Sequence, residues 1–167
     1  MGTENVSEKY SIRTAIQRDI PELIRMRLKL QEHMEHVNNL ILRYKDDWKN
    51  DLPFIYNKLL NDPNVIILIA VTKQDNEIVG MMVGTIHEHH QFTIEKSVKI
   101  DDVWVEAEHR QRGICSQILS DLHNRFTEQG IEHFTLNYVV NNLEAEQTWQ
   151  RLGFIPTIIN CVAKMKD

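Results

Sequence analysis

A short basic loop lies between a predicted strand and a predicted helix, and its residues could bind an anion. Val103 and Val105 show the alternation of β-branched residues that is typical of a strand, and from Ile114 onward apolar residues recur at helical spacing. Arg110 and Gly113 lie between these two patterns. A helix N-terminus exposes unpaired N–H groups and suits a phosphate, and glycine lets the backbone approach a ligand closely. The loop therefore predicts a pyrophosphate site, although a turn with solvated charges would explain the same residues.

The common nucleotide-binding motifs of other fold classes are missing. No Gly-Lys-Ser or Gly-Lys-Thr follows the loop, so it is not a Walker-type phosphate loop. The three spaced glycines of a dinucleotide-binding fold are also absent. A phosphate site at this position must therefore be of another kind.

Two blocks of the sequence resemble the GNAT superfamily of N-acyltransferases. Residues 110–115, Arg-Gln-Arg-Gly-Ile-Cys, resemble the family's acyl-coenzyme A loop, Gln/Arg-x-x-Gly-x-Gly/Ala, with Cys115 where the family prefers Gly or Ala. Asn142, Ala145, Trp149 and the Leu-Gly-Phe at 152–154 resemble the family's Asn-x-x-Ala, aromatic, Leu-Gly-Phe block. The two blocks stand in the family's order, and the resemblance extends from about residue 10 to the C-terminus.

The resemblance implies a fold and a co-substrate. The expected fold is α+β, an α/β sandwich in which helices flank a mixed, mostly antiparallel twisted sheet with one parallel, splayed pair of strands. Acetyl-coenzyme A is the expected co-substrate, and no metal is expected. The residues expected to bind the coenzyme are Val103, Trp104, Val105, Arg110, Gln111, Arg112, Gly113, Ile114, Cys115, Ser116, Asn142, Ala145 and Trp149.

The reaction that the resemblance implies is direct transfer of the acetyl group to a primary amine of a small cationic molecule. An alkyl ammonium ion has a pKa of about 10.4, so it must lose a proton before it can attack. The family often places an acidic residue on the strand before the loop, which makes Asp101 the first candidate for the base, Asp102 the second and Glu106 the third. Alternatively, one of the two aspartates only holds a neighbouring Arg or Lys.

The group that protonates the departing thiolate is less obvious from the sequence. Family members commonly carry a tyrosine where this chain has Trp149, and an indole has no proton to give at accessible pH. Tyr138 could take over this role, and Trp149 could equally be a packing residue. Two other functions remain open: a non-catalytic acyl-coenzyme A sensor or interaction module, and an acetyltransferase acting on protein N-termini or lysines.

Composition limits the class of protein. The chain has 167 residues, which fits a single acetyltransferase domain over residues 1–167, with residues 1–9 predicted to be a flexible tail. A formal charge of −5 argues against nucleic-acid binding and mildly favours a cationic acceptor. Two cysteines, no apolar run long enough for a bilayer and no signal-like N-terminus predict a cytoplasmic protein with no membrane partner. Dimers are frequent in the family, so a homodimer is also possible.

The sequence patterns predict six strands and four helices. Asp19 with Glu22 resembles a capping box that starts a helix. The segment 87–90, His-Glu-His-His, is interpreted as an exposed loop, with a metal site and a lining of the acceptor site as alternatives. The predicted strands are 10–14, 65–71, 78–86, 97–105, 133–139 and 156–164, and the predicted helices are 20–36, 52–60, 114–127 and 143–151.

Overall fold

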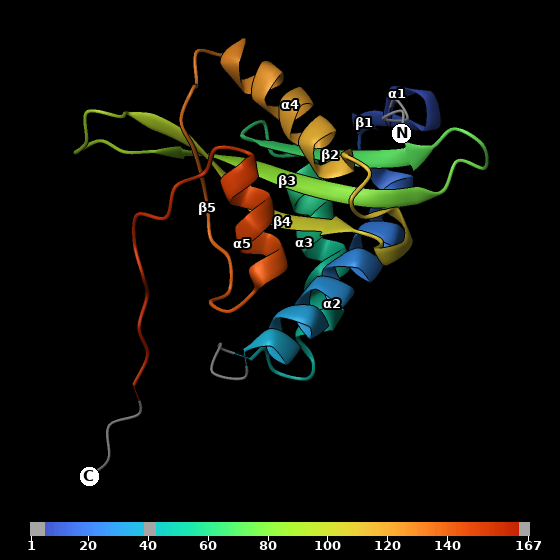
Figure 1. Cartoon of the computed structure of the whole chain (residues 1–167), viewed down its shortest axis with the longest axis horizontal. Coiled ribbons are helices and arrows are strands. Elements are labelled where there is room, and N and C mark those ends of the chain that lie inside the picture. Colours follow the sequence, from blue (N-terminus) through green and yellow to red (C-terminus); the bar gives the residue numbers. More distant parts are fainter. Residues whose placement is uncertain (1–5, 39–42, 164–167) are drawn as a thin grey trace.

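The computed structural model describes residues 6–38 and 43–163, and five strands form one sheet in the order β1-β2-β3-β4-β5 (Figure 1). The first four strands pair antiparallel, and β5 pairs parallel with β4. The strands are β1 (Tyr10–Thr14), β2 (Val65–Thr72), β3 (Ile78–Glu88), β4 (Lys96–Val105) and β5 (Phe134–Leu136). The expected mixed α+β fold is confirmed.

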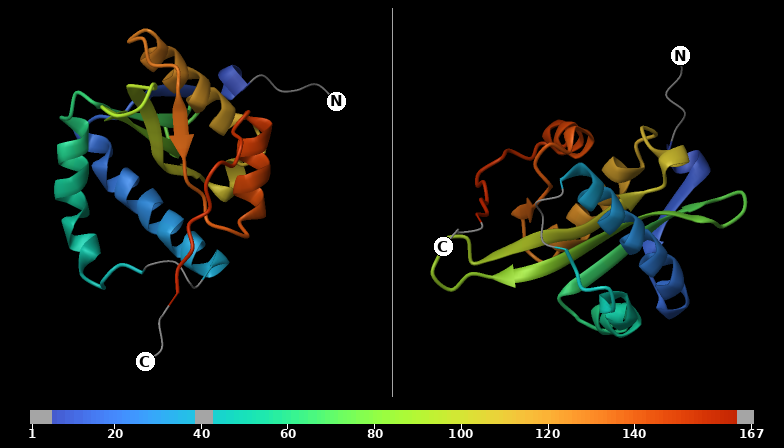
Figure 2. Two further views of the ribbon diagram at one scale, coloured as in Figure 1. Left: turned by 90° about the vertical axis from the view of Figure 1, so that its left-hand side faces the viewer. Right: turned by 90° about the horizontal axis from the view of Figure 1, so that it is seen from below.

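Helices cover both faces of this sheet (Figure 2). On one side lie α2 (Ile20–Val37) and α3 (Leu52–Leu60), and on the other lie α4 (Ile114–Thr127) and α5 (Leu143–Arg151). The α1 helix (Val6–Lys9) and three short 3₁₀ turns, η1 (Gln17–Asp19), η2 (Trp48–Asp51) and η3 (Ala107–His109), complete the regular structure of the described residues.

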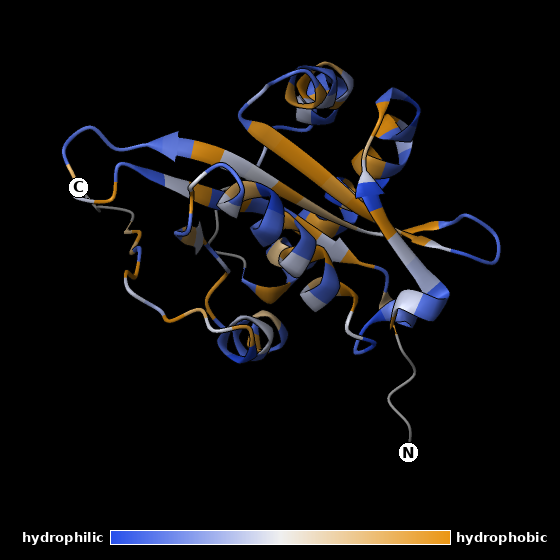
Figure 3. Ribbon diagram, turned by 90° about the horizontal axis from the view of Figure 1, so that it is seen from above, coloured by the Kyte–Doolittle hydropathy of each residue, from blue (hydrophilic) through white to orange (hydrophobic). Residues whose placement is uncertain are grey.

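The β2 strand shows why a two-sided core forms. Leu68 and Ala70 pack with α4, whereas Ile67, Ile69 and Val71 pack with α2 and α3. Side chains alternate across a strand, so an uninterrupted apolar run can supply both faces only when both are covered. Figure 3 shows this apolar band inside the helical layers. Burial of each Leu, Ile or Val side chain of this strand contributes about 1.5–3 kcal/mol.

A bulge in β4 changes the faces of the two aspartates. Met82 pairs with Val103 and Gly84 pairs with Ile100, so Asp101 and Asp102 together oppose the single residue between Met82 and Gly84. Simple alternation predicts that Asp101 shares a face with Val103, and this is wrong. The extra residue puts both carboxylates on the side of the sheet that α2 and α3 cover, where Asp102 meets both helices.

Several predicted boundaries need correction. The predicted closing strand is absent: residues 154–163 form no strand, and Lys164 lies outside the described residues. This segment runs away from the sheet (Figure 1), so its backbone has no strand to pair with, and Ile158 and Ile159 are about four-fifths exposed. The predicted strand 133–139 shortens to the three residues of β5, because β5 pairs with β4 only there.

The predicted loop 87–90 and the predicted tail 1–9 also differ from expectation. His87 and Glu88 belong to β3, because they pair with Ser97 and Lys96 of β4, and the loop begins at His89. Val6–Lys9, predicted to belong to a loose tail, forms α1; the first five residues of that tail lie outside the described part of the chain. In the described residues, no helix is long and apolar enough to cross a bilayer.

The predicted capping box at Asp19 is wrong. Its carboxylate accepts two hydrogen bonds from the guanidinium of Arg13, at 2.6 and 3.0 Å, and one from the backbone N–H of Ile16 at 2.8 Å. The backbone of Asp19 is already helical, with φ −86° and ψ −10°, so its side chain does not reach forward to the amides of α2. Glu22 pairs with Arg25 instead.

The contact between Arg13 and Asp19 should make the stability of the protein depend on pH. The hydrogen bond from Arg13 holds the pKa of Asp19 below its ordinary value, and burial only partly opposes it. A lowered pKa contributes stability above the unfolded-state value of about 3.9, and the contribution is lost as pH falls through the folded-state pKa. We expect Asp19→Asn to lower the free energy of unfolding by about 1 kcal/mol at neutral pH. This difference from the wild type should shrink toward zero at about pH 2. Urea unfolding across pH measures this, and an equal difference at both ends of the range would contradict it.

Candidate active site

A cleft opens where β4 and β5 separate. The two strands pair only as far as Ile100 and Leu136, and beyond these residues they diverge. Residues 101–105 of β4 therefore leave one backbone edge facing a cavity of about 800 Å³, while the other edge pairs with β3. The cavity is large enough for a ligand of drug or cofactor size.

The start of α4 forms one end of this cleft. Gly113 has a left-handed backbone with φ +81°, and Gln111 is also left-handed with φ +59°. No side chain of the described residues caps the helix, and its first backbone bond runs from the N–H of Gln117 to the carbonyl of Gly113. The amides of the first turn thus have no partner within the helix, which is the arrangement that binds an anion.

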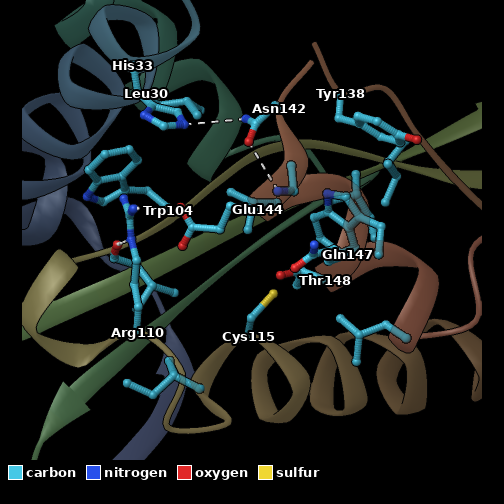
Figure 4. Close-up of a pocket in the computed structure, with 18 of the residues that line it drawn as sticks. Leu30, His33, Trp104, Arg110, Cys115, Tyr138, Asn142, Glu144, Gln147 and Thr148 are labelled. Carbon is cyan, nitrogen blue, oxygen red and sulfur yellow. Dashed lines mark hydrogen bonds and ion pairs between the residues drawn. The ribbon is translucent and has the colours of Figure 1, made fainter. Parts of the chain in front are cut away.

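The two arginines of the loop have different roles. Arg110 lies across the cleft: its Nε donates to the carbonyl of Val105 at 2.9 Å, its guanidinium stacks 4.7 Å above the ring of Trp104, and it pairs with Glu144 of α5 at 3.0 Å (Figure 4). Arg112 does not line the cavity, and its guanidinium points to the hydroxyl of Tyr10 at 3.5 Å. Only one of the two therefore adds charge to the cleft.

Asp101 and Asp102 both line the cleft, and each already has a cation. Asp101 pairs with Lys99 at 2.7 Å and accepts a hydrogen bond from the hydroxyl of Thr85 at 3.0 Å. Asp102 pairs with Arg27 of α2 at 3.1 Å and accepts one from the hydroxyl of Tyr56 at 3.0 Å. Burial raises the pKa of Asp102 above its ordinary value, because desolvation disfavours the charged carboxylate more than Arg27 favours it.

Glu106, the third acidic candidate, does not line the cavity. Its carboxylate lies between Arg25, at 2.5 Å, and Lys29, at 2.9 Å, and these contacts tie α2 to the end of β4. Burial by itself would raise the pKa of Glu106, but the hydrogen bonds from Lys29 and Arg25 outweigh it and lower the pKa. A carboxylate held in this way accepts a proton poorly.

The α5 helix supplies the opposite wall. The Oδ1 of Asn142 accepts a hydrogen bond from the N–H of Ala145 at 3.1 Å and so caps the helix, while its Nδ2 lies 3.4 Å from the Nε2 of His33 (Figure 4). Trp149 is 7% exposed and packs edge-on against Phe154, which favours the packing interpretation of this residue, although it also contributes to the cavity wall.

The remaining predicted site residues also reach the cleft. Tyr138 follows β5 and lines the cavity. Burial raises the pKa of the Cys115 thiol to about 11, so this cysteine is a protonated thiol at neutral pH and a poor nucleophile. The structure brings the following predicted residues to one cavity: Asp101, Asp102, Val103, Trp104, Val105, Arg110, Gln111, Gly113, Ile114, Cys115, Ser116, Tyr138, Asn142, Ala145 and Trp149.

Sequence reasoning missed the residues that line the cleft from other elements. Leu30, His33 and Met34 come from one face of α2, and His109 comes from η3. The spacing of Leu30 and Met34 predicts an apolar helix face, and His33 beside them was the available signal. Conversely, no residue of the 87–90 segment lines the cavity; within it, His89 contacts Ser97 at 2.8 Å.

Comparison with known proteins identifies the family of this arrangement. A sequence model of the acetyltransferase (GNAT) family matches residues 33–154, which include His33 and the cavity-lining residues of β4, α4 and α5. The chain belongs to the GNAT acetyltransferase family. No curated protein sequence is significantly similar to the chain.

Solved structures show the same GNAT fold at low sequence identity. A variant of the BH1408 protein from Bacillus halodurans is 18% identical, with a TM-score of 0.82 over 93% of this chain and 99% of that one. A predicted acetyltransferase from Clostridium acetobutylicum, solved with acetyl-CoA, is 18% identical, with a TM-score of 0.75 over 93% and 96%. The aminoglycoside 6'-N-acetyltransferase AAC(6')-Ih from Acinetobacter baumannii is 14% identical, with a TM-score of 0.73 over 95% and 99%.

Proposed function

We propose that the protein transfers an acetyl group from acetyl-coenzyme A directly to a primary amine of a small cationic molecule. The observation that carries this proposal is that one cavity is lined both by the start of α4, whose first amides have no side-chain cap, and by the carboxylates of Asp101 and Asp102. The amides would bind the phosphates, and the carboxylates would receive the amine.

In the proposed complex, each wall of the cleft holds a different part of the coenzyme. The amides of Ile114, Cys115 and Ser116 would bind the pyrophosphate, and the left-handed backbone of Gly113 permits the turn that exposes them. The free edge of β4 at Val103–Val105 offers backbone N–H and C=O groups to a pantetheine arm and an N–H to the acetyl oxygen, where negative charge develops during transfer. Asn142 and Ala145 would border the arm from α5.

The acidic end suits a cationic acceptor. The carboxylates of Asp101 and Asp102 offer oxygens to an ammonium ion beside their own cations, Lys99 and Arg27, and the chain carries a net charge of −5. Among the similar structures, an aminoglycoside acetyltransferase from a soil metagenomic sample was solved in complex with sisomicin, a polycationic amine, at 18% identity. Either aspartate would have to give up its cation before it could accept a proton itself, so holding the ammonium ion is the role that leaves the observed ion pairs intact.

The proposal is tested in two stages. Calorimetry with coenzyme A should show binding, and mass spectrometry should then detect an added acetyl group on an amine from a panel of spermidine, sisomicin, a lysine-containing peptide and a peptide with a free N-terminus. Acetylation of spermidine or sisomicin supports the proposal. Transfer only to the peptides would favour a protein acetyltransferase. Absence of coenzyme binding would refute the assignment of the cleft.

A non-catalytic acyl-coenzyme A sensor is the second candidate. The observation that favours it is that Asp101, Asp102 and Glu106 are all held by cations, while Trp149 is buried where the family commonly has a tyrosine. A sensor would bind coenzyme A in the calorimeter and acetylate no amine of the panel. Slow hydrolysis of the thioester without transfer to an amine would also favour the sensor.

The ion pair between Arg110 and Glu144 leads to a prediction about affinity. In the free protein Glu144 holds Arg110 across the cleft, and its charge also repels a phosphate. We expect Glu144→Gln to bind coenzyme A about threefold to tenfold more tightly, because the neutral side chain releases Arg110 toward the coenzyme. Calorimetry at low and high salt measures this, and the gain should shrink with salt. Glu146→Gln, on the same helix but outside the cavity, is the matched control; an equal gain there would contradict the explanation.

A further inference from the structure

His33 is an ionisable side chain of the cleft that the proposed chemistry leaves unused. It projects from α2 toward α5, where its Nε2 lies 3.4 Å from the Nδ2 of Asn142, and its ring meets Trp104 edge-on with centroids 6.1 Å apart (Figure 4). Trp104 belongs to the free edge of β4, and Asn142 belongs to the opposite wall. His33 therefore lies between the two walls at the level of the thioester site proposed above.

The cap of α5 fixes which atom of Asn142 faces the histidine. Because Oδ1 accepts the N–H of Ala145 at 3.1 Å, the amide presents its NH₂ group to His33. An NH₂ group only donates, so the Nε2 of His33 must offer a lone pair, and the ring proton is on Nδ1. The structure thus holds the imidazole in the tautomer that can accept a proton at Nε2, inside the cleft.

Among the described residues, the acidic side chains that line the cleft are each paired with a basic side chain, whereas His33 is not. Asp101 pairs with Lys99, Asp102 with Arg27 and Glu144 with Arg110. His33 has a neutral amide as its hydrogen-bond partner. Proton acceptance by His33 would therefore break no ion pair.

We propose that His33 is the catalytic proton acceptor for the incoming ammonium group, and this inference rests on the proposed acetyltransferase function. Asn142 also borders the place for the pantetheine arm. A coenzyme that takes the amide of Asn142 releases the Nε2 of His33, so coenzyme binding itself frees the base. The amine should therefore be deprotonated by His33 only after acetyl-coenzyme A has bound.

The proposed step balances as follows. The Nε2 of His33 takes one proton from R–NH₃⁺ and leaves the neutral amine. The nitrogen lone pair forms the N–C bond to the acetyl carbon, the C–S bond breaks, and its electron pair leaves on sulfur. The second proton of the reacting nitrogen passes to the thiolate, which gives the amide and the coenzyme thiol. The imidazolium then returns its proton to water.

Charged groups on every side of the cleft will influence the pH profile. These groups come from β4, from the loop before α4 and from α5, and they are Asp101, Asp102, His109, Arg110, Glu144 and Arg151. On α2 itself, Lys29 is paired with Glu106, and His36 is exposed. His109 is the other histidine of the cavity, and its Nδ1 lies 2.9 Å from the hydroxyl of Tyr10.

The test compares His33→Gln with the control His36→Gln, which changes an exposed histidine on the same helix. Glutamine keeps a hydrogen-bonding side chain but cannot accept the proton. With the amine of the panel that the wild type acetylates, we expect His33→Gln to lower kcat about 100-fold and to remove the acidic limb of the kcat profile, with coenzyme A affinity changed less than about threefold. His36→Gln should match the wild type. In a His33→Ala variant, added imidazole should restore part of the rate.

A second measurement follows the NMR signal of the His33 imidazole. Proton–carbon NMR of the imidazole groups, with the His33 signal assigned by its loss in His33→Gln, should show this signal shift when coenzyme A is added. A wild type that acetylates an amine while His33→Gln keeps the rate and the acidic limb overturns this inference alone. A wild type that binds coenzyme A and acetylates no amine of the panel overturns the proposed function and this inference with it.

Discussion

Gly113→Glu should weaken coenzyme A binding about 100-fold or more while the protein stays folded. Gly113 has φ +81°, a conformation that costs an L-residue about 1–2 kcal/mol. A Cβ at this position would meet the Cγ2 of Val6 at 2.9 Å, so the Val6 side chain of α1 would also have to shift. The carboxylate adds a negative charge beside the uncapped amides that we propose bind the phosphates. Calorimetry with coenzyme A measures the loss.

The chain offers a matched control at the other end of the same helix. Gly130 follows α4 and has φ +77°, but a Cβ there would meet no atom within 4 Å. Gly130→Glu therefore carries the same backbone cost and the same new charge, away from the cleft. It should lose about 1 kcal/mol of stability and keep the affinity of the wild type. If both variants bind equally well, the start of α4 is not the phosphate site.

Asp102→Ala should be strongly destabilising, by about 3 kcal/mol in urea unfolding. Arg27 is 8% exposed, and its guanidinium contacts the rings of Trp48, at 5.1 Å, and Tyr44, at 5.6 Å, besides the carboxylate of Asp102. Without that carboxylate the guanidinium remains buried with no counter-charge, and the hydroxyl of Tyr56 loses its acceptor. Glu88→Ala, which breaks an exposed pair with Lys96, should change stability by less than about 0.5 kcal/mol.

A double variant separates the structural role of Asp102 from any role in catalysis. Replacing both partners, as Arg27→Met with Asp102→Leu, removes the buried charge together with its counter-charge and should recover most of the lost stability. If His33 accepts the proton, the double variant should keep the pH profile of the wild type and show mainly a higher KM for the amine. A double variant that is stable but has lost the acidic limb of the profile would instead assign proton acceptance to Asp102.

The sequence alone determined the elements with a clear local pattern. The bounds predicted for β1, α4 and α5 agree with the structure at both ends, and the apolar helix face predicted from Leu52 to Leu60 coincides with α3. Apolar spacing within one helix or strand depends on residues that are neighbours in the chain, so the pattern and the element share the same short range. The loop at 110–115 was recognisable for the same reason, since all of its groups lie within one turn.

The tertiary structure decided the features that depend on distant residues. The bulge that turns Asp101 toward α2 and α3 exists only because β3 pairs with β4, and the segment expected as a closing strand finds no partner edge. The counter-charge of Asp102 comes from α2, and His33 meets Asn142 across 109 residues of chain. Such contacts are set by how helices pack on the sheet, and no local spacing encodes them. The sequence thus predicted the loop that we propose binds the coenzyme and the aspartates that we propose hold the amine, whereas His33, the proposed proton acceptor, was recognised only in the folded chain.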